Sequence, residues 1–210
     1  MRLRYAMLAI AGVLAVAVIA AARWHLPLNP LAGGESRPSS VAGTSKIAVG
    51  GPFTLVTQSG KTVTDATFRG KYLLVYFGYT YCPDVCPTEL AEIATVLDKL
   101  GPPAAAIQPL FITVDPERDS PSVLASYVPQ FYERLIGLTG TPEQIAQVAK
   151  AYHVYYAKVE DKDTPGAYLM DHSAFVYLIG PDGTYLTMFS HRTGPDAMVK
   201  TLRGYLKKTS

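Results

Sequence analysis

Residues 72–77, with the sequence YLLVYF, constrain the fold more than any other segment of the chain. A continuous apolar run of this length, rich in aromatic and branched side chains, is typical of a strand that is buried on both faces. Such a strand needs neighbouring strands along its edges and further elements over both faces of the sheet. We therefore expect an α/β domain in which this strand is central.

The rest of the chain alternates between strand and helix patterns, and its last third predicts a hairpin and a helix. Gly101 is typical of a helix end, and Thr141-Pro142-Glu143-Gln144 is a capping box with proline at the first helical position. A tight turn is predicted at Gly180-Pro181-Asp182-Gly183. The expected strands are residues 52–56, 62–64, 72–77, 108–114, 154–159, 174–179 and 184–189, and the expected helices are residues 90–100, a helix opened by Ser120-Pro121 and limited by Pro129, residues 141–152, and a helix opened by Pro195.

A β–α–β unit followed by β–β–α is the arrangement of thioredoxin-like domains. We therefore predict an α/β, thioredoxin-like fold, with a mixed central sheet and flanking helices, behind an N-terminal transmembrane helix. Cys82 and Cys86 directly follow the central strand. In open α/β sheets, ligands bind at this carboxyl end of the strands.

Residues 5–22 are uncharged and largely apolar. Eighteen residues span roughly 27 Å as a helix, close to the roughly 30 Å hydrocarbon core of a bilayer. Arg2 and Arg4 precede the run and place the N-terminus on the cytoplasmic side. Residues 1–24 are thus predicted to be a transmembrane anchor, or alternatively a signal sequence cleaved near Ala20-Ala21-Ala22. With so few residues before the run, the pattern indicates a bacterial inner-membrane protein that crosses once and faces the periplasm.

Residues 25–50 are rich in Pro, Gly and Ser and lack periodicity, so we expect a flexible tether there. Residues 51–210 have the length of one domain. The whole chain has a net charge of +2, and without Arg2, Arg4 and Arg23 it keeps 16 basic and 17 acidic residues. This balance argues against a nucleic-acid partner.

The only cysteines of the chain, Cys82 and Cys86, could form a structural disulfide, a redox pair or half of a metal site. A domain of this length does not need a disulfide to fold. A bridge that closes so short a loop also removes little entropy from the unfolded chain. A purely structural disulfide is therefore the weakest of the three interpretations.

The cysteine loop is expected to lie at a helix N-terminus, where unpaired N–H groups favour the thiolate form of Cys86. Asp84 either caps the helix or supports the site from a distance, and the sequence leaves both roles open. A thioredoxin oxidoreductase has two residues between its cysteines, whereas this loop has three. The pair can therefore close a disulfide or hold an ion between two sulfurs.

Two thiolates with one imidazole suit copper, and the sulfurs select Cu(I). Among the four histidines, His25 lies beside the membrane segment, while His153 and His191 have ordinary explanations at a helix end and a hairpin end. His172 precedes an expected buried strand whose start faces the cysteine loop, so we favour it as the ligand over a plain loop role. Asp171 either orients this imidazole as a hydrogen-bond acceptor or only forms a turn.

Four motifs occur together along residues 50–206: Gly51-Pro52-Phe53, Gly70-Lys71 before YLLVYFGYTYCPDVCPTEL, Val114-Asp115-Pro116-Glu117-Arg118-Asp119, and Asp171-His172-Ser173 before Gly180-Pro181-Asp182-Gly183. In this combination the chain resembles the Sco/SenC family, membrane-tethered copper proteins of cytochrome c oxidase assembly. The resemblance implies that Cys82, Cys86 and His172 bind copper, as Cu(I), Cu(II) or both. It also implies delivery to the binuclear copper site of oxidase subunit II, with another copper chaperone or a periplasmic thiol reductant as a further partner.

The sequence is compatible with two functions. The first is a copper metallochaperone, which is not an enzyme, and the second is a thiol–disulfide oxidoreductase that uses a redox-active Cys82–Cys86 disulfide to reduce the oxidase subunit. A peroxidase is disfavoured, because Pro83 stands where peroxiredoxins place threonine or serine three residues before the cysteine. The sequence feature that separates the first two is His172, which a copper site needs and a dithiol reductase does not.

Overall fold

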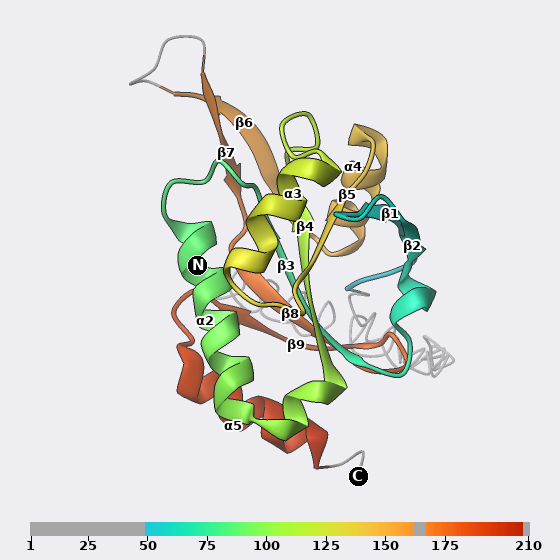
Figure 1. Cartoon of the computed structure of the whole chain (residues 1–210), viewed down its shortest axis with the longest axis vertical. Coiled ribbons are helices and arrows are strands. Elements are labelled where there is room, and N and C mark those ends of the chain that lie inside the picture. Colours follow the sequence, from blue (N-terminus) through green and yellow to red (C-terminus); the bar gives the residue numbers. More distant parts are fainter. Residues whose placement is uncertain (1–48, 162–166, 208–210) are drawn as a thin grey trace, which may run out of the picture. The chain divides into compact units, whose positions relative to one another are not determined.

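A computed structural model describes residues 49–161 and 167–207, and its central feature is a seven-stranded mixed sheet (Figure 1). The strand order is β2-β1-β5-β4-β3-β8-β9. The strands are β1 (Thr54–Thr57), β2 (Thr62–Thr64), β3 (Tyr72–Gly78), β4 (Ile107–Thr113), β5 (Ile136–Thr139), β8 (Phe175–Ile179) and β9 (Tyr185–Ser190).

The expected central strand is confirmed as β3, in which all seven residues are buried. It runs parallel to β4, with Tyr76 opposite Phe111, and antiparallel to β8, with Tyr76 opposite Val176. The sheet is therefore mixed, as the sequence predicted. Because β3 and β4 are parallel, their carboxyl ends lie at the same edge of the sheet, and the cysteine loop begins there.

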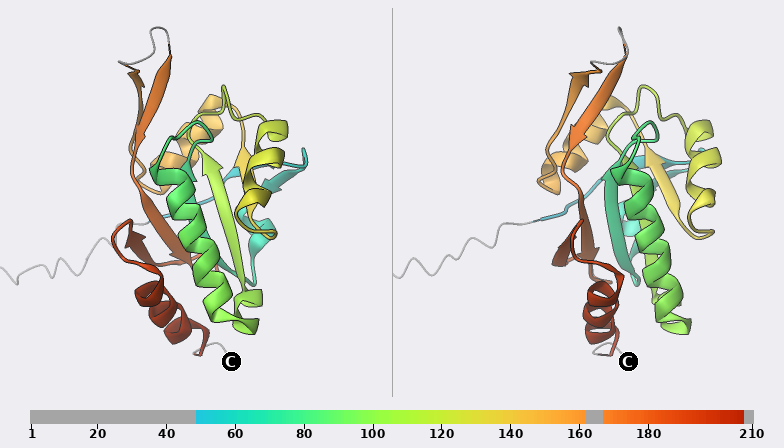
Figure 2. Two further views of the ribbon diagram at one scale, coloured as in Figure 1. Left: turned by 60° about the vertical axis from the view of Figure 1, so that its left-hand side comes forward. Right: turned by 90° about the vertical axis from the view of Figure 1, so that its left-hand side faces the viewer.

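Helices cover both faces of this sheet (Figure 2). The crossovers α2 and α3 lie on one face, with α5 packed beside α2, while α4 lies on the other. Three short 3-10 helices occur as well. They are η1 (Asp65–Phe68) after β2, η2 (Pro102–Ala106) after α2, and η3 (Val128–Gln130) after α3. The helices are α2 (Val85–Leu100), α3 (Pro121–Tyr127), α4 (Pro142–Ala151) and α5 (Pro195–Leu206).

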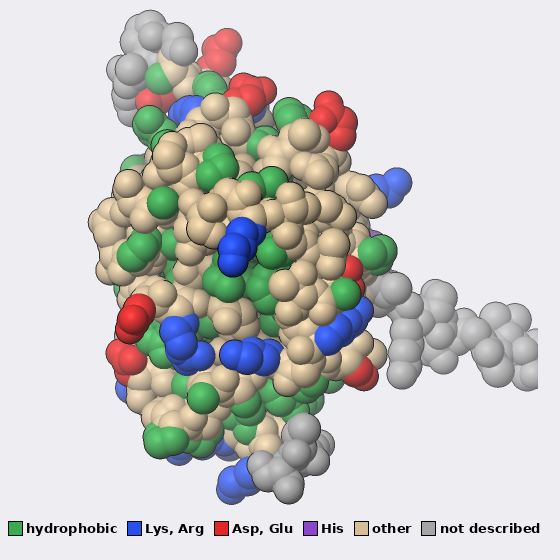
Figure 3. All heavy atoms as spheres, turned by 45° about the vertical axis from the view of Figure 1, so that its right-hand side comes forward, with side chains coloured by type: hydrophobic (Ala, Val, Ile, Leu, Met, Phe, Trp, Pro, Cys, Tyr) green, Lys and Arg blue, Asp and Glu red, His purple; other side chains and the backbone are tan. Residues whose placement is uncertain are grey.

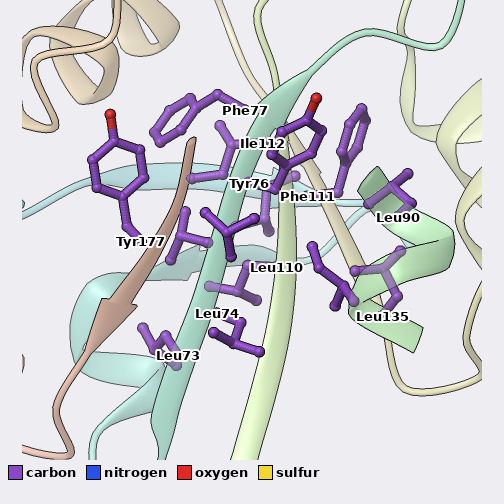
Figure 4. Packing of buried hydrophobic residues seen from close by; sticks show 14 of the residues in the cluster. Leu73, Leu74, Tyr76, Phe77, Leu90, Leu110, Phe111, Ile112, Leu135 and Tyr177 are labelled. Carbon is purple, nitrogen blue, oxygen red and sulfur yellow. The ribbon is translucent and has the colours of Figure 1, made fainter. Parts of the chain in front are cut away.

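Alternate residues of β3 point to opposite faces and join two packed layers (Figure 4). Phe77 packs edge-on against Tyr177, with ring centroids 6.1 Å apart. On the other side Tyr76 packs against Phe111, with centroids 6.3 Å apart. Aromatic rings therefore fill both layers close to the carboxyl end of β3, which leads into the cysteine loop.

The helix boundaries follow from the capping residues that the sequence predicted. The Ser120 hydroxyl accepts a hydrogen bond from the Val123 amide, and Thr141 forms the expected capping box with Gln144. Gly101 ends α2 with a φ of 65°, a conformation that favours glycine. α2 begins at Val85, earlier than the apolar spacing indicated, so Cys86 lies within its first turn.

Two further strands form a separate ribbon, β6 (Tyr156–Glu160) paired antiparallel with β7 (Tyr168–His172). The ribbon extends past the edge of the central sheet beyond the cysteine loop (Figures 1 and 2). The expected strand at residues 154–159 corresponds to β6, whereas β5 and β7 were not predicted. His172 lies just before the buried strand β8, as expected, and it is also the last residue of the unpredicted strand β7.

The predicted anchor at residues 1–24 and nearly all of the predicted tether at residues 25–50 lie outside the described residues. Within the part of the chain that the structure describes, no helix is both long and apolar enough to cross a membrane. The described residues belong to one compact unit, Ile47–Ser210.

Charged side chains of both signs lie on the surface of this unit (Figure 3). On the face shown, Lys and Arg side chains stand apart from one another, and Asp and Glu lie mostly toward the edges of the view. Between them the surface is mostly backbone and uncharged polar side chains, with scattered apolar patches.

Candidate metal centre

The two cysteines lie where β3 passes into α2, as the sequence predicted. Cys86 is fully buried in the first turn of the helix, and Cys82 is half-buried in the loop before it. Both thiols are free, and the Cys86 amide donates a hydrogen bond to Cys82 Sγ over 3.4 Å. The helix terminus therefore directs an unpaired N–H group at the outer sulfur, Cys82.

His172 reaches the same place from the ribbon. Its Nε2 lies 3.4 Å from Cys86 Sγ, and its Nδ1 lies 3.1 Å from the Ser173 carbonyl oxygen. Because a carbonyl oxygen only accepts, Nδ1 carries the proton and Nε2 presents its lone pair toward the sulfur. A metal-binding histidine is commonly held in this way by a backbone carbonyl.

Two tyrosines enclose the imidazole. The rings of Tyr76 and Tyr79 both stand edge-on to His172, with centroids 6.3 Å and 5.9 Å away. Such contacts orient the ring in addition to burying it. The ring plane is therefore set by Ser173 on one side and by two aromatic neighbours on the others.

Cys82, Cys86 and His172 each offer one ligand atom, and these three atoms all lie within 4.8 Å of one another. Two sulfurs that share one ion at bond lengths near 2.3 Å can be at most ~4.6 Å apart. The spacing of the three atoms is therefore compatible with one shared ion. The donor set of two thiols and one imidazole suits a soft ion, and Cu(I) above all.

The two thiols differ in their tendency to ionise. The hydrogen bond with Cys82, together with burial, raises the pKa of the Cys86 thiol, while the hydrogen bond from Cys86 lowers the pKa of Cys82. The pair thus shares one proton and one negative charge. The sequence interpretation assigned the favoured thiolate to Cys86, and this was wrong, because Cys86 is the buried member of the pair. Metal binding through both sulfurs must release the remaining proton.

Gly78, the last residue of β3, lets the Cys86 sulfur approach the strand. A Cβ atom at this position would lie 2.9 Å from Cys86 Sγ, 2.9 Å from the Phe111 ring and 3.1 Å from the Tyr76 ring. Cβ atoms essentially never lie closer than 3.0 Å to such neighbours, so a larger residue here would force the sulfur or the ring to shift. Sequence reasoning missed this residue, and its only signal was a glycine between a buried strand and the cysteine loop.

The two aspartates proposed as supporting residues are both exposed. Asp84 occupies the N-cap position of α2, but its side chain makes no capping hydrogen bond. Its backbone carbonyl accepts from the Thr88 amide and hydroxyl, at 3.3 Å and 3.0 Å. Asp171 pairs with Ala157 across the ribbon, and Ser173 takes the acceptor role expected of Asp171.

A groove of about 430 Å³ opens beside the cluster. Cys82 and His172 line it, together with apolar side chains of the loop and the ribbon such as Val85, Val159 and Leu169. Cys86 is not part of its lining. An ion or a partner would therefore meet Cys82 and His172 first.

Comparisons with a family model, with curated proteins and with solved structures all point to the same family. A family model described as SCO1/SenC matches residues 41–207. The human protein SCO1 homolog, mitochondrial, is 45% identical over 173 residues, which cover 78% of this chain and 56% of that protein. The chain spans about half to three-fifths of the length of its mitochondrial relatives from Arabidopsis thaliana, Homo sapiens and Bos taurus.

Two solved structures with copper bound are similar to the chain. ScoI of Arabidopsis thaliana is 41% identical with a TM-score of 0.71, and the match covers 77% of this chain and 98% of that one. ScoI of Bradyrhizobium japonicum is 46% identical with a TM-score of 0.69, covering 75% and 99%. Both matches support the predicted mixed α/β fold.

Proposed function

The chain belongs to the SCO1/SenC family, and on that premise we propose that it is a copper metallochaperone of cytochrome c oxidase assembly. Copper binds through the sulfurs of Cys82 and Cys86 and the imidazole of His172. The observation that carries the proposal is the convergence of these three ligand atoms within 4.8 Å. The copper in the solved structures of the two ScoI proteins supports the choice of metal.

The donor set accommodates both oxidation states of copper in different ways. The two thiolates would hold Cu(I) as soft sulfur donors, and the imidazole would add a nitrogen ligand. Cu(II) prefers a tetragonal set with nitrogen and oxygen ligands, so it depends more on His172. Loss of the imidazole is therefore expected to weaken Cu(II) binding more than Cu(I) binding.

The recipient in this proposal is the binuclear copper centre of oxidase subunit II. Another copper chaperone or a periplasmic thiol reductant acts upstream, to load the site or to keep its thiols reduced. Residues 1–24 tether the protein to a bacterial inner membrane and residues 51–210 face the periplasm. The groove beside Cys82 and His172 gives a partner access to two of the three ligands.

A second candidate function, reduction of a disulfide in the oxidase subunit, is favoured by the asymmetry of the thiols. Cys82 is the half-exposed sulfur with the lowered pKa, as expected of an attacking thiolate. It would attack the disulfide and release one thiolate of the partner, and Cys86 would then displace the other. The protein would leave with a Cys82–Cys86 disulfide, which the thiol reductant must reduce again.

Copper titration of the reduced full chain in detergent tests the metal site. The wild type should bind one equivalent of copper, whereas Cys82→Ser and Cys86→Ser should each lose tight binding, because serine lacks the soft sulfur donor. His153→Asn is a matched control, since asparagine tolerates the φ of 55° at that position. A serine variant that still holds one equivalent at wild-type affinity would refute the two-sulfur site.

A further inference from the structure

The three proposed ligands come from two separately held parts of the fold. Cys82 and Cys86 lie on the loop and helix that leave the central sheet, whereas His172 ends the β6–β7 ribbon, which forms its own two-stranded sheet. The ribbon has no ladder of backbone hydrogen bonds to the central sheet. Only Ser173 and Ala174 separate His172 from β8, which pairs with β3, so side-chain contacts that hold the ribbon add to this short backbone link in placing the imidazole.

Arg118 makes the most extensive of these contacts. Its Nη1 donates to the backbone carbonyl of Tyr168 on β7 over 2.9 Å, and its Nε pairs with the carboxylate of Asp115. Asp115 is 1% exposed, and its other oxygen accepts from the Tyr168 hydroxyl over 3.0 Å. Arg118 thus binds the backbone of Tyr168, and Asp115 binds its hydroxyl. Tyr168 lies four residues before His172.

The guanidinium also stacks on aromatic rings from both parts of the fold. Its carbon atom lies 3.7 Å from the ring centroid of Tyr168 on the ribbon, and 4.7 Å and 5.7 Å from the centroids of Tyr81 and Tyr79 in the cysteine loop. Planar stacking of this kind is available to arginine and not to lysine. Arg118 therefore joins the ribbon directly to the loop that carries Cys82.

The other end of the same segment holds the cysteine loop. Asp119, which is fully buried, accepts from the Thr80 amide and hydroxyl at 3.0 Å and 2.6 Å and from the Thr113 hydroxyl at 2.6 Å. Residues 115–119 thus fix the cysteine loop through Asp119 and the ribbon through Arg118. This short segment therefore connects the two ligand-bearing parts through side chains, in addition to the backbone link from His172 to β8.

We propose that Arg118 is a positioning residue that holds His172 at the metal centre and thereby sets how strongly the site binds Cu(II) relative to Cu(I). The inference rests on the proposed function, in that it assigns His172 as the ligand on which Cu(II) depends. Arg118 does not touch the metal. It acts by keeping β7 in place, so that the imidazole lies in reach of both sulfurs.

The test compares Arg118→Lys with Arg134→Lys in the reduced full chain. Lysine keeps the positive charge beside Asp115 but loses the stacking and the second donor. Arg134 is a matched control, because it too is half-buried, donates to backbone carbonyls (Ile107 and Ala104) and lies over a tyrosine ring. It does so at the start of β4, the end of the parallel strands opposite the cysteines.

Anaerobic competition titrations and electron paramagnetic resonance of the Cu(II) form give the readouts. We expect Arg118→Lys to weaken Cu(II) binding at least about tenfold, the lower range for residues that orient a ligand, and to change the nitrogen signature of the spectrum. Cu(I) binding should change less than roughly threefold, because both sulfurs stay in place. Arg134→Lys should leave both affinities and the spectrum unchanged.

A double-mutant cycle separates positioning from general destabilisation. If Arg118 acts only through the imidazole, Arg118→Lys combined with His172→Ala should bind Cu(II) no more weakly than His172→Ala alone. Effects that add up in the double variant would overturn the proposal. Tyr168→Leu removes the ring under the guanidinium from the ribbon side and should reproduce the Arg118→Lys result, which guards against a folding defect in one variant.

Hydrogen exchange supplies a readout that needs no copper. Amides of β7 should exchange faster in Arg118→Lys than in the wild type and in Arg134→Lys. Unchanged exchange in β7 would refute the role of Arg118 whatever the copper titrations show. A wild-type protein that binds no copper would instead refute the proposed function, while faster exchange in β7 would still show that Arg118 holds the ribbon.

Discussion

At the residue scale, the two sulfurs of the site have unequal surroundings. Cys86 lies against the glycine at the end of β3 and is closed off from solvent, while Cys82 lines the groove. A buried thiol that shares its proton with a neighbour is a poor nucleophile, and a half-exposed thiolate is a good one. An incoming partner is therefore expected to react first at Cys82, both in metal exchange and in thiol exchange.

The substitution His172→Ala separates the two proposed functions. We expect Cu(II) affinity to fall about 10- to 100-fold or more, since a ligand is lost, and Cu(I) affinity to fall less. In cells, the variant should assemble oxidase poorly at limiting copper and better when copper is added. The measurements are copper titrations and oxidase activity at graded copper.

His153→Asn serves as the control for that experiment. Normal binding of both copper states by His172→Ala, together with failed oxidase assembly, would contradict a ligand role. The imidazole would then act as a proton carrier in thiol exchange, and the reductase function would be the better account.

The buried carboxyl of Glu89 should make the stability of the fold depend on pH. It is 1% exposed, and burial raises the pKa of its carboxyl above the usual 4.5 despite an opposing hydrogen bond of 2.9 Å with His191. Because the folded state binds the proton more tightly, this group stabilises the fold fully below about pH 4.5. That contribution is lost as the pH rises through the raised pKa.

Glu89→Gln should remove this loss. In urea unfolding at several pH values, the variant should gain stability relative to the wild type as the pH rises from 4.5 toward neutrality. The amide substitution Asp98→Asn, at an exposed carboxylate of the same helix, should leave the pH profile unchanged. A difference that stays constant over this pH range would show that burial does not control the carboxyl.

At the scale of elements, the sequence was sufficient for strands and helices with strong periodicity or capping signals. The continuous apolar run of β3, the Gly101 helix end and the Thr141 capping box are all confirmed. Strand β5 was missed because IGLT is only four residues long and contains a glycine. Strand β7 was missed because YLMDH mixes exposed and buried positions without a clear alternation, in a ribbon separate from the central sheet.

The residues of the site likewise divide into those with a strong signal in the sequence and those without one. Cys82, Cys86 and His172 were found because few residue types bind soft metals, so their positions on the expected fold could be compared. Arg118 could not be assigned a role, because its contact with Tyr168 joins residues 50 positions apart. A single glycine such as Gly78 is likewise too common to stand out without its neighbours in space.

One prediction at this scale concerns the cap of α4. Thr141 accepts from the Gln144 amide, and Gln144 Oε1 accepts from the Thr141 amide over 2.8 Å. Thr141→Ala should therefore lower the free energy of unfolding by about 1 kcal/mol. Chemical denaturation measures the change, and copper affinity should stay at the wild-type value because α4 lies on the face of the sheet away from α2. A copper defect of similar size would contradict this separation.

At the scale of the whole molecule, the domain boundary predicted near residue 50 remains to be tested. Val49 packs against the core, and the Gly50 amide donates to the Ala151 carbonyl over 2.8 Å. A chain that begins at Ile47 should therefore be soluble and unfold cooperatively without the preceding residues. An insoluble product, or one without a cooperative transition, would mean that the boundary is misplaced.

A second chain that begins at Phe53 is the matched comparison. It lacks Val49 and the hydrogen bond from Gly50, so it should be less stable by about 1 kcal/mol or more. Thermal unfolding of both chains measures the difference. Equal stability would indicate that the contacts of residues 49–50 do not contribute to the fold.

The separation of Cys86 and His172 along the chain has a consequence for the lifetime of the protein in the cell. They are 86 residues apart, and a bound ion would fasten these distant positions together much as a disulfide does. In the chain-entropy model, a link across so long a loop removes conformational freedom from the unfolded state equivalent to roughly 4–5 kcal/mol. Proteases that attack transiently opened molecules would then degrade empty protein faster than loaded protein. The metal would in this way select which copies survive.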